Sequence, residues 1–200
     1  MKSTGRSIAS PTRYSVFATI AFVLLASPAS AADIDVSQRI AQCVTCHGAN
    51  GNSATAKIPS LAGQPEFFLL NQLILMREGV RQVAVMTPFV SNLSDAEAEG
   101  LAKHFAALEA KPSGEAVNPA LAARGAALVE RLHCASCHLP TYVGRNQMPR
   151  LAKQRIDYMV ESLKAIRESQ RAGGDSLMTA AVAGISDEDL EALAHYVASH

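Results

Sequence analysis

The hydrophobic and polar positions along the chain predict helices and almost no strands. Apolar residues recur at helical spacing after Ser94 and again after Ser186, and a serine at such a place is a common helix N-cap. Acidic residues follow three positions later, Glu97 and Asp189, in or near the capping-box position. The apolar residues that share one face of these predicted helices are Leu101, Phe105 and Leu108 in the first and Leu190, Leu193 and Val197 in the second.

Three more helices are predicted from their start and stop signals. A helix over 66–77 follows Pro65 and ends before Gly79, and a similar one spans about 155–170. Another helix, over about 119–132, leads into the second of two cysteine motifs. Because strand patterns are nearly absent, we predict an all-α fold.

The chain contains a tandem repeat. The sequence IPSLAGQ at 58–64 resembles MPRLAKQ at 148–154, at an offset of 90. Further on, NLSD at 92–95 resembles GISD at 184–187, at an offset of 92. The second copy has therefore gained two residues between these segments.

A short linker is predicted between the two copies, over 111–116. Pro112 and Gly114 break helices there, and the neighbouring residues are small or polar. This boundary leaves one small all-α domain over 33–110 and a second over 117–200.

The first 31 residues have the order of a secretory signal peptide. Three basic residues come first, an apolar run covers 16–26, and a small-x-small pattern follows at 29–31. The apolar run is about 11 residues, well short of the roughly 20 that span a bilayer as a helix. We expect cleavage between Ala31 and Ala32 and a mature protein that is soluble and exported.

Charge and composition exclude two classes of protein. The chain has 18 Lys and Arg against 18 Asp and Glu, and 48% of its residues are hydrophobic. Three basic and no acidic residues lie before the predicted cleavage site, so the mature chain has a net charge of −3. The nearly equal numbers of basic and acidic residues and the high hydrophobic content argue against a disordered tail. They also argue against a nucleic-acid-binding protein, which concentrates positive charge. Aromatic residues are only 5% and Trp is absent, so something other than aromatic side chains must fill the core.

The four cysteines form two copies of the motif C-x-x-C-H, which is the attachment signature of c-type haem. Two thiols three residues apart on a helical turn project from one side, where they can form thioethers with the two haem vinyl groups. The histidine after the second cysteine then supplies one axial nitrogen to the iron. The six residues are Cys43, Cys46 and His47 in the first motif and Cys134, Cys137 and His138 in the second.

Three other interpretations of the cysteines carry less weight. A thioredoxin-like redox pair leaves the repeated histidine unexplained, and no βαβ pattern surrounds it. Tetrahedral zinc and a disulfide within each motif are the other two. Two covalently bound haem c groups explain every cysteine, and a buried porphyrin in each domain would replace the missing aromatic surface.

The repeat also indicates the second axial ligand, which a haem iron needs if it is to carry electrons. Met86 and Met178 correspond to each other at the offset of 92, in predicted irregular segments, and a thioether ligand favours ferrous iron. Met76 and Met159 fall on predicted helices, where methionine usually fills the core. Met148, in a loop near the second motif, remains a competitor of Met178.

The remaining histidines are less favoured as iron ligands. His104 and His195 have no histidine at the corresponding repeat position, and His200 is terminal. His133 directly precedes Cys134 and is expected to point away from the iron. We expect each of the four to be a surface or partly buried histidine.

Two pairs of arginines also recur in the repeat. At the offset of 90, Arg77 corresponds to Arg167 and Arg81 to Arg171. One arginine of each pair could meet a haem propionate, and the alternative is a solvated helix face.

The arrangement resembles class I cytochrome c, in two tandem domains each wrapped around one covalent haem, and the pair resembles the dihaem cytochrome c4 family. The resemblance covers nearly all of the mature chain. It implies that Pro59 and Pro149, after the two motifs, offer their carbonyls to Nδ1–H of the axial histidines. Leu139 and Pro140 depart from the family, which usually has glycine after the motif, so the second haem loop is expected to differ.

The resemblance implies a bacterial electron carrier of the periplasm, exported by the cleaved signal peptide. Because the sequence shows no general-base or nucleophile constellation, we predict that it has no catalytic activity of its own. It would be soluble or peripherally associated with the membrane, and would exchange electrons with redox proteins such as respiratory complexes or a terminal oxidase. The alternatives are a cytochrome subunit of a dehydrogenase complex and a dihaem peroxidase-like enzyme. A peroxidase needs an open iron site, which rapid binding of carbon monoxide by the reduced protein would reveal.

Overall fold

The computed structural model describes residues 1–2, 5, 35–173 and 176–200. The predicted signal peptide lies outside the described residues, apart from 1–2 and 5. The described part is helical, and its strand-like pairing is an isolated bridge between Arg145 and Met148. The helices of the first repeat are α1 (Ser37–His47), α2 (Glu66–Arg77), α3 (Thr87–Val90) and α4 (Asp95–Ala106), and those of the second are α5 (Pro119–Arg131), α6 (Ala135–His138), α7 (Ile156–Arg167), α8 (Ser176–Val182) and α9 (Asp187–Ala198).

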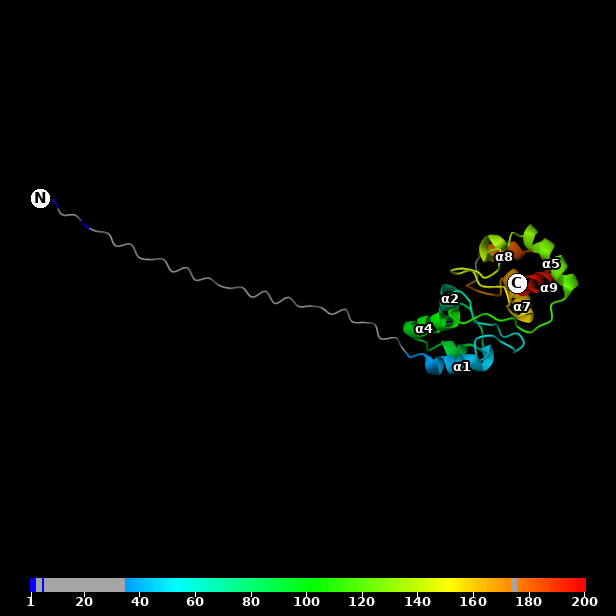
Figure 1. Ribbon diagram of the computed structural model, residues 1–200, viewed down its shortest axis with the longest axis horizontal. Coiled ribbons are helices and arrows are strands. Elements are labelled where there is room, and N and C mark those ends of the chain that lie inside the picture. The colour runs from blue at the N-terminus through cyan, green and yellow to red at the C-terminus, as the bar shows by residue number, and fades with distance from the viewer. Residues whose placement is uncertain (3–4, 6–34, 174–175) are drawn as a thin grey trace. The chain divides into compact units, whose positions relative to one another are not determined.

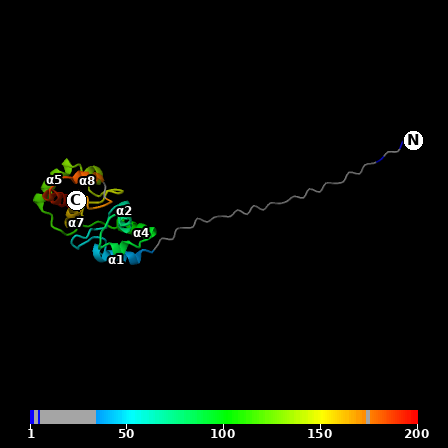
Figure 2. The ribbon, with the colours of Figure 1, turned by 180° about the vertical axis from the view of Figure 1, so that it is seen from behind.

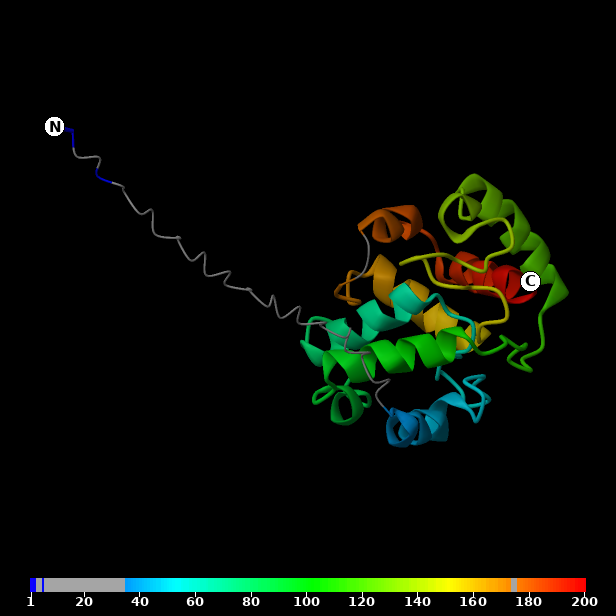
Figure 3. The same ribbon diagram turned by 60° about the vertical axis from the view of Figure 1, so that its left-hand side comes forward.

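Each repeat has its own hydrophobic core. In the first, α2 and α1 pack against α4, and in the second, α5 and α7 pack against α9. Figures 1 and 2 show the helices of each repeat grouped together from opposite sides, and Figure 3 shows α9, in red, beside α5. The buried residues of the first core are Leu69, Val90, Leu93, Leu101, Ala102 and Phe105. The second core includes Leu128, Val129, Ile156, Met159, Leu190 and Leu193.

The predicted N-caps of α4 and α9 are confirmed. Ser94 accepts a hydrogen bond from the backbone N–H of Glu97, whose side chain binds back to the N–H of Ser94 in a complete capping box. Ser186 accepts from the N–H of Asp189. The helix expected to reach residue 170 ends earlier, at the C-cap after α7, because Ser169 takes a φ of +56° that no right-handed helix contains.

The two cysteine motifs lie on different local structures. In the first repeat, α1 continues without a break through the motif to His47. In the second, α5 stops at Arg131, His133 has a φ of +53°, and the motif continues on the separate short helix α6.

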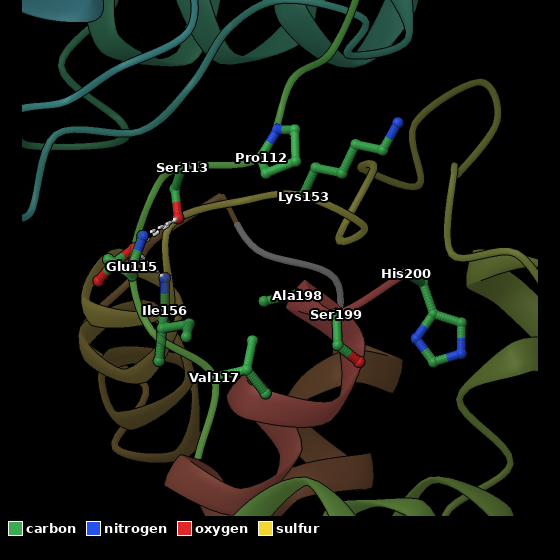
Figure 4. A pocket seen from close by; sticks show the side chains of 9 residues that line it. All are labelled: Pro112, Ser113, Glu115, Val117, Lys153, Ile156, Ala198, Ser199 and His200. Atoms are coloured by element: carbon green, nitrogen blue, oxygen red, sulfur yellow. Dashed lines mark hydrogen bonds between the residues drawn. The ribbon is translucent and has the colours of Figure 1, made fainter. Parts of the chain in front are cut away.

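The predicted linker is fixed to the second repeat by Glu115. The carboxylate of Glu115 accepts hydrogen bonds from the backbone N–H groups of Ile156 (2.8 Å) and Asp157 (3.1 Å), at the start of α7. This places a negative charge at the helix N-terminus, where the helix dipole favours it. Figure 4 shows Glu115 beside Ser113 in a pocket lined by the linker and the end of α9, and none of the candidate haem ligands lines this pocket.

The crossing of α5 and α9 depends on Gly125. A Cβ atom at this position would lie 2.7 Å from the Cβ of Tyr196 and even closer to the carbonyl oxygen of Ala192. We expect Gly125→Val to lower the free energy of unfolding by about 1–3 kcal/mol, as overpacking does, with Ala127→Val on the exposed face of α5 as the matched control. Denaturant unfolding of the haem-loaded chain measures both, and equal stability of the two variants would contradict the expectation.

Among the described residues, no helix is both long enough and apolar enough to cross a bilayer.

Candidate haem-binding sites

All four cysteines are unpaired thiols in the structure. Cys43 and Cys134 are half-buried against the two cores, whereas Cys46 and Cys137 are exposed. Burial raises the pKa of the Cys43 and Cys134 thiols. The structure contains no disulfide between these four cysteines, which contradicts the disulfide interpretation. Within the described residues, no group of three or more His, Cys, Asp or Glu side chains forms a metal-binding cluster of the zinc type.

The two motif histidines are buried and held in the same way. His47 and His138 are each 6% exposed, and their Nδ1–H groups donate to the carbonyl oxygens of Pro59 (2.8 Å) and Pro149 (2.9 Å). A carbonyl can only accept, so the proton of the neutral ring is on Nδ1 and Nε2 keeps its lone pair. Burial lowers the pKa of both imidazoles, although the proline carbonyls oppose it, and burial thus favours the neutral ring.

The loops after the two motifs share one backbone pattern at their ends. The second loop still differs as expected, because it is one residue shorter between the histidine and the proline and contains the bridge between Arg145 and Met148. The carbonyl of Gly51 accepts from the N–H groups of Leu61 and Ala62, and that of Tyr142 accepts from Leu151 and Ala152. Directly after each histidine, Gly48 has φ, ψ of 86°, 148° and Leu139 has 68°, 158°. Leu139 therefore holds a conformation that normally requires glycine, a strain of about 1–3 kcal/mol.

Met86 and Met178 are both partly buried and pack against the core of their own repeat. Met86 is the N-cap residue of α3. Met178 lies inside α8, so the expectation of an irregular segment was wrong for it. Met148 is in a loop as expected, where its carbonyl and N–H pair with Arg145. Met159 is a buried core residue and Met76 is packed on the first core, as their helical positions predict.

The other histidines have different surroundings. His133 and His200 are exposed, and His104 is partly buried. His195 is only 8% exposed, which corrects the expectation of a surface or partly buried side chain. Its Nδ1 accepts a hydrogen bond from the backbone N–H of Asn118 (3.1 Å), the N-cap of α5, so the ring connects α9 to the start of α5.

The two arginine pairs have different partners in the structure. Arg77 forms ion pairs with Glu78 and Asp95, both at 2.8 Å, and Arg167 does the same with Glu168 and Asp187. These arginines therefore already have carboxylate partners.

The second pair has no carboxylate partner in the described part of the chain. Arg81 and Arg171 instead donate to one oxygen, Oε1 of Gln72, at 2.6 and 3.4 Å. Burial alone would raise the pKa of Tyr158, but the charges of Arg171 and Arg81 outweigh burial and lower it to about 8. Two guanidinium groups thus face each other where the repeats meet, a place suited to a negative group.

Two buried glutamines connect the repeats next to the histidine-binding prolines. Gln154 of the second repeat binds the backbone of Ser60, and Gln64 of the first repeat binds the backbone of Arg150. Both glutamines belong to the repeated segments 58–64 and 148–154, but no motif in the sequence assigns them a role. A polar residue that recurs within an otherwise apolar repeat is the signal that could have identified them.

Arg150 itself has an unusual environment. It is 3% exposed, its Nη2 donates to the carbonyl of Ala62 in the other repeat (2.9 Å), and its Nη1 donates to that of Ala152. Its Nε is buried and has no hydrogen-bond partner among the described residues, and burial lowers the pKa of the guanidinium to about 10. A buried cation with a free donor fits a negatively charged group such as a haem propionate.

Comparisons with known proteins agree with this geometry. Residues 37–104 match the family described as cytochrome c oxidase, cbb3-type, subunit III, and residues 122–200 match the family described as cytochrome c. A cytochrome c4 from Pseudomonas aeruginosa is 35% identical over 170 residues, covering 80% of this chain and 84% of that protein. The chain belongs to the cytochrome c4 family. The crystal structure of reduced recombinant cytochrome c4 from Pseudomonas stutzeri is similar with a TM-score of 0.76 and 33% identity, covering 82% of this chain and 96% of that one.

As a member of the cytochrome c4 family, the protein contains two cytochrome c domains and binds two covalent haem c groups. It is an electron carrier rather than an enzyme. A further relative, named thiosulfate dehydrogenase electron acceptor, comes from Thiomonas intermedia. It is 34% identical over 198 residues, covering 91% of this chain and 88% of that protein.

Proposed function

We propose that this cytochrome passes electrons between redox proteins of the periplasm through two haems with one histidine and one methionine ligand each. The haems would occupy two domains, over 33–110 and 117–200, joined by the linker 111–116. When bound, each haem supplies a reversible one-electron couple at its iron. The residues proposed to hold the first haem are Cys43, Cys46, His47 and Met86, and those proposed for the second are Cys134, Cys137, His138 and Met178.

The observation that carries this proposal is the state of the two histidines. Each ring is buried, its Nδ1–H donates to a proline carbonyl, and Nε2 is left as the donor to a metal. The first cysteine of each motif and the proposed methionine pack against the same hydrophobic core, Cys43 with Met86 and Cys134 with Met178. The chain therefore supplies thiols, imidazole and thioether around one apolar region in each repeat.

The negative groups of the haems also have candidate partners. We assign propionate binding to Arg150 and to the pair Arg81 and Arg171, because these cations lack a carboxylate among the described residues. Pairing would relieve the buried charge of Arg150.

Exposed apolar side chains next to the methionines support contact with partner proteins. Val85 is 62% exposed and Phe89 39% exposed on either side of Met86, and Leu177, next to Met178, is 69% exposed. Apolar groups at the surface favour transient association with another protein. We place these contacts at the methionine side of each haem.

The test is an optical spectrum of the protein matured in a periplasm, with quantification of haem. We expect two covalent haems per chain, both low-spin, and a long-wavelength band from methionine bound to ferric iron. A correctly processed but colourless protein would refute haem binding by these motifs. Absence of the long-wavelength band would refute the methionine ligands alone.

A second candidate function is the electron acceptor of one dedicated dehydrogenase. The likeness to the thiosulfate dehydrogenase electron acceptor of Thiomonas intermedia favours it. Stopped-flow mixing of the oxidised protein with thiosulfate dehydrogenase and thiosulfate tests it, with thiosulfate alone as the control. Reduction that saturates at micromolar protein would support a dedicated pair, and reduction no faster than in the control would exclude thiosulfate dehydrogenase as the donor.

A further inference from the structure

We propose that Gln64 and Gln154 are positioning residues that act across the two repeats. Each glutamine polarises the peptide group that orients the axial histidine of the other repeat, and thereby lowers the reduction potential of the haem in that other repeat. The inference rests on the proposed roles of His47 and His138 as iron ligands.

The peptide group between Pro59 and Ser60 is hydrogen-bonded at both of its ends. Its carbonyl oxygen accepts from Nδ1 of His47 (2.8 Å), and its N–H donates to Oε1 of Gln154 (2.8 Å). Nε2 of Gln154 in turn donates to the carbonyl of Ser60 (2.9 Å). Gln154 belongs to the second repeat, so one side chain of that repeat binds the peptide that holds the histidine of the first.

The same arrangement occurs in the opposite direction. The carbonyl of the Pro149–Arg150 peptide accepts from Nδ1 of His138 (2.9 Å), and its N–H donates to Oε1 of Gln64 (3.0 Å). Nε2 of Gln64 donates to the carbonyl of Arg150 (3.0 Å). Both glutamines are buried, at 4% and 3% exposure, so water does not compete for these bonds.

An amide that donates at its nitrogen becomes a stronger acceptor at its oxygen, because both hydrogen bonds favour the charge-separated form. Hydrogen bonds in such chains strengthen each other, by about 10–30% per bond. A stronger acceptor draws the Nδ1 proton away from the imidazole and makes Nε2 more basic, which raises the basicity of the ligand toward a metal. A more basic ligand stabilises ferric over ferrous iron, so each glutamine lowers the potential on the opposite side.

Other contacts between the repeats do not touch these peptide groups. The N–H of Lys57 donates to Asp157 (2.9 Å), and the ammonium of Lys57 lies 3.6 Å from Glu161. These contacts also hold the two repeats together, so the glutamines are not the sole connection between them. The contact with Glu161 offers a control that weakens the same interface without altering the peptide groups.

The test replaces each glutamine by leucine in the full chain with both haems and measures both potentials. An NMR redox titration of haem methyl resonances, assigned to each repeat, gives the two values separately. We expect Gln154→Leu to raise the potential of the first-repeat haem and Gln64→Leu that of the second-repeat haem. Each reduction equilibrium should change about threefold, which is about 28 mV at 59 mV per tenfold change. The haem of the mutated repeat should change less than its partner.

Three control variants separate polarisation from loosening of the interface. Gln38→Leu and Gln170→Leu make the same substitution at exposed positions of the two repeats, and Glu161→Ala removes an ion pair between them. If Gln154→Leu does not yield a haem-loaded protein, Gln154→Asn replaces it in the test. The asparagine side chain keeps the amide but is one methylene shorter, so the amide lies farther from the Pro59–Ser60 peptide group. This variant should give a smaller shift at the same haem.

The crossed pattern of shifts would support the inference, together with an upfield move of the His47 Nδ1–H resonance in Gln154→Leu or Gln154→Asn. Equal shifts of both haems would instead indicate entry of water at the interface, and would overturn it. A shift confined to the haem of the mutated repeat, or no shift in either haem, would overturn it as well. If the unmutated protein does not contain two low-spin haems, the result refutes the proposed function and not the inference about the glutamines.

Discussion

Removing the thioether of Met178 is expected to open one of the two haems to exogenous ligands. The reduced Met178→Ala variant should bind carbon monoxide rapidly at about half of its haem, and the ferric form should lose about half of the long-wavelength methionine band. Both effects are about one half because each of the two haems is proposed to have one methionine ligand, and only the second haem loses it. Carbon monoxide difference spectra measure the first effect, and the potential of the same haem should fall because the thioether favours ferrous iron.

Met148→Ala is the matched control, because Met148 is the competing methionine in the second repeat. It lies in a loop where its backbone pairs with Arg145, and this pairing does not need the side chain. We expect Met148→Ala to keep the full band and to bind no carbon monoxide. The reverse result would make Met148 the ligand. Met86→Ala should reproduce the Met178→Ala result at the other haem.

The second large effect is expected from the cysteines. The double variant Cys134→Ser and Cys137→Ser should carry one covalent haem instead of two, because neither thioether of the second repeat can form. Intact-mass measurement gives the number of attached haems directly. Ser136→Ala, between the two cysteines, is the control and should keep both haems. A double variant that retained two covalent haems would show that other residues attach the second group.

Much of the helical structure could be predicted because its signals are local. The caps of α4 and α9 depend on a serine and the residues that follow within one turn, and the end of α2 depends on the turn at Gly79. The candidate haem residues could be proposed for the same reason, since each motif spans only five positions. The pairing of Met86 with Met178 needed the repeat offset in addition.

Other features depend on contacts that a local pattern does not contain. Leu139 holds the backbone conformation of Gly48 because the hydrogen bonds of Tyr142 with Leu151 and Ala152 fix the loop around it. Composition therefore predicted that the second loop differs, but not that the residue directly after its histidine keeps the backbone conformation of Gly48. Met178 lies on α8 for a related reason, because the packing of α7 against α8 extends helical structure into a segment without a strong helical pattern.

The roles of Gln64 and Gln154 could not be predicted because their partners are about 90 positions away. Their amide groups bind backbone atoms of the other repeat, and Oε1 of Gln154 also accepts from the backbone N–H of Arg155 in its own repeat. A sequence shows that both glutamines recur, but it does not show that the two segments meet.

The reciprocal glutamine bonds also bear on how such a chain could arise by duplication. Each repeat presents the same donor and acceptor surface to the other, which is the arrangement of an isologous dimer interface. The bonds reach only the backbone at positions 60 and 150, so Ser60 and Arg150 were free to diverge without loss of the contact. If a single ancestral domain already formed a dimer with its own copy, gene fusion would have kept the same contact surface between the two halves, and no new one would have been needed. The linker would then have served to raise the effective concentration of one half beside the other.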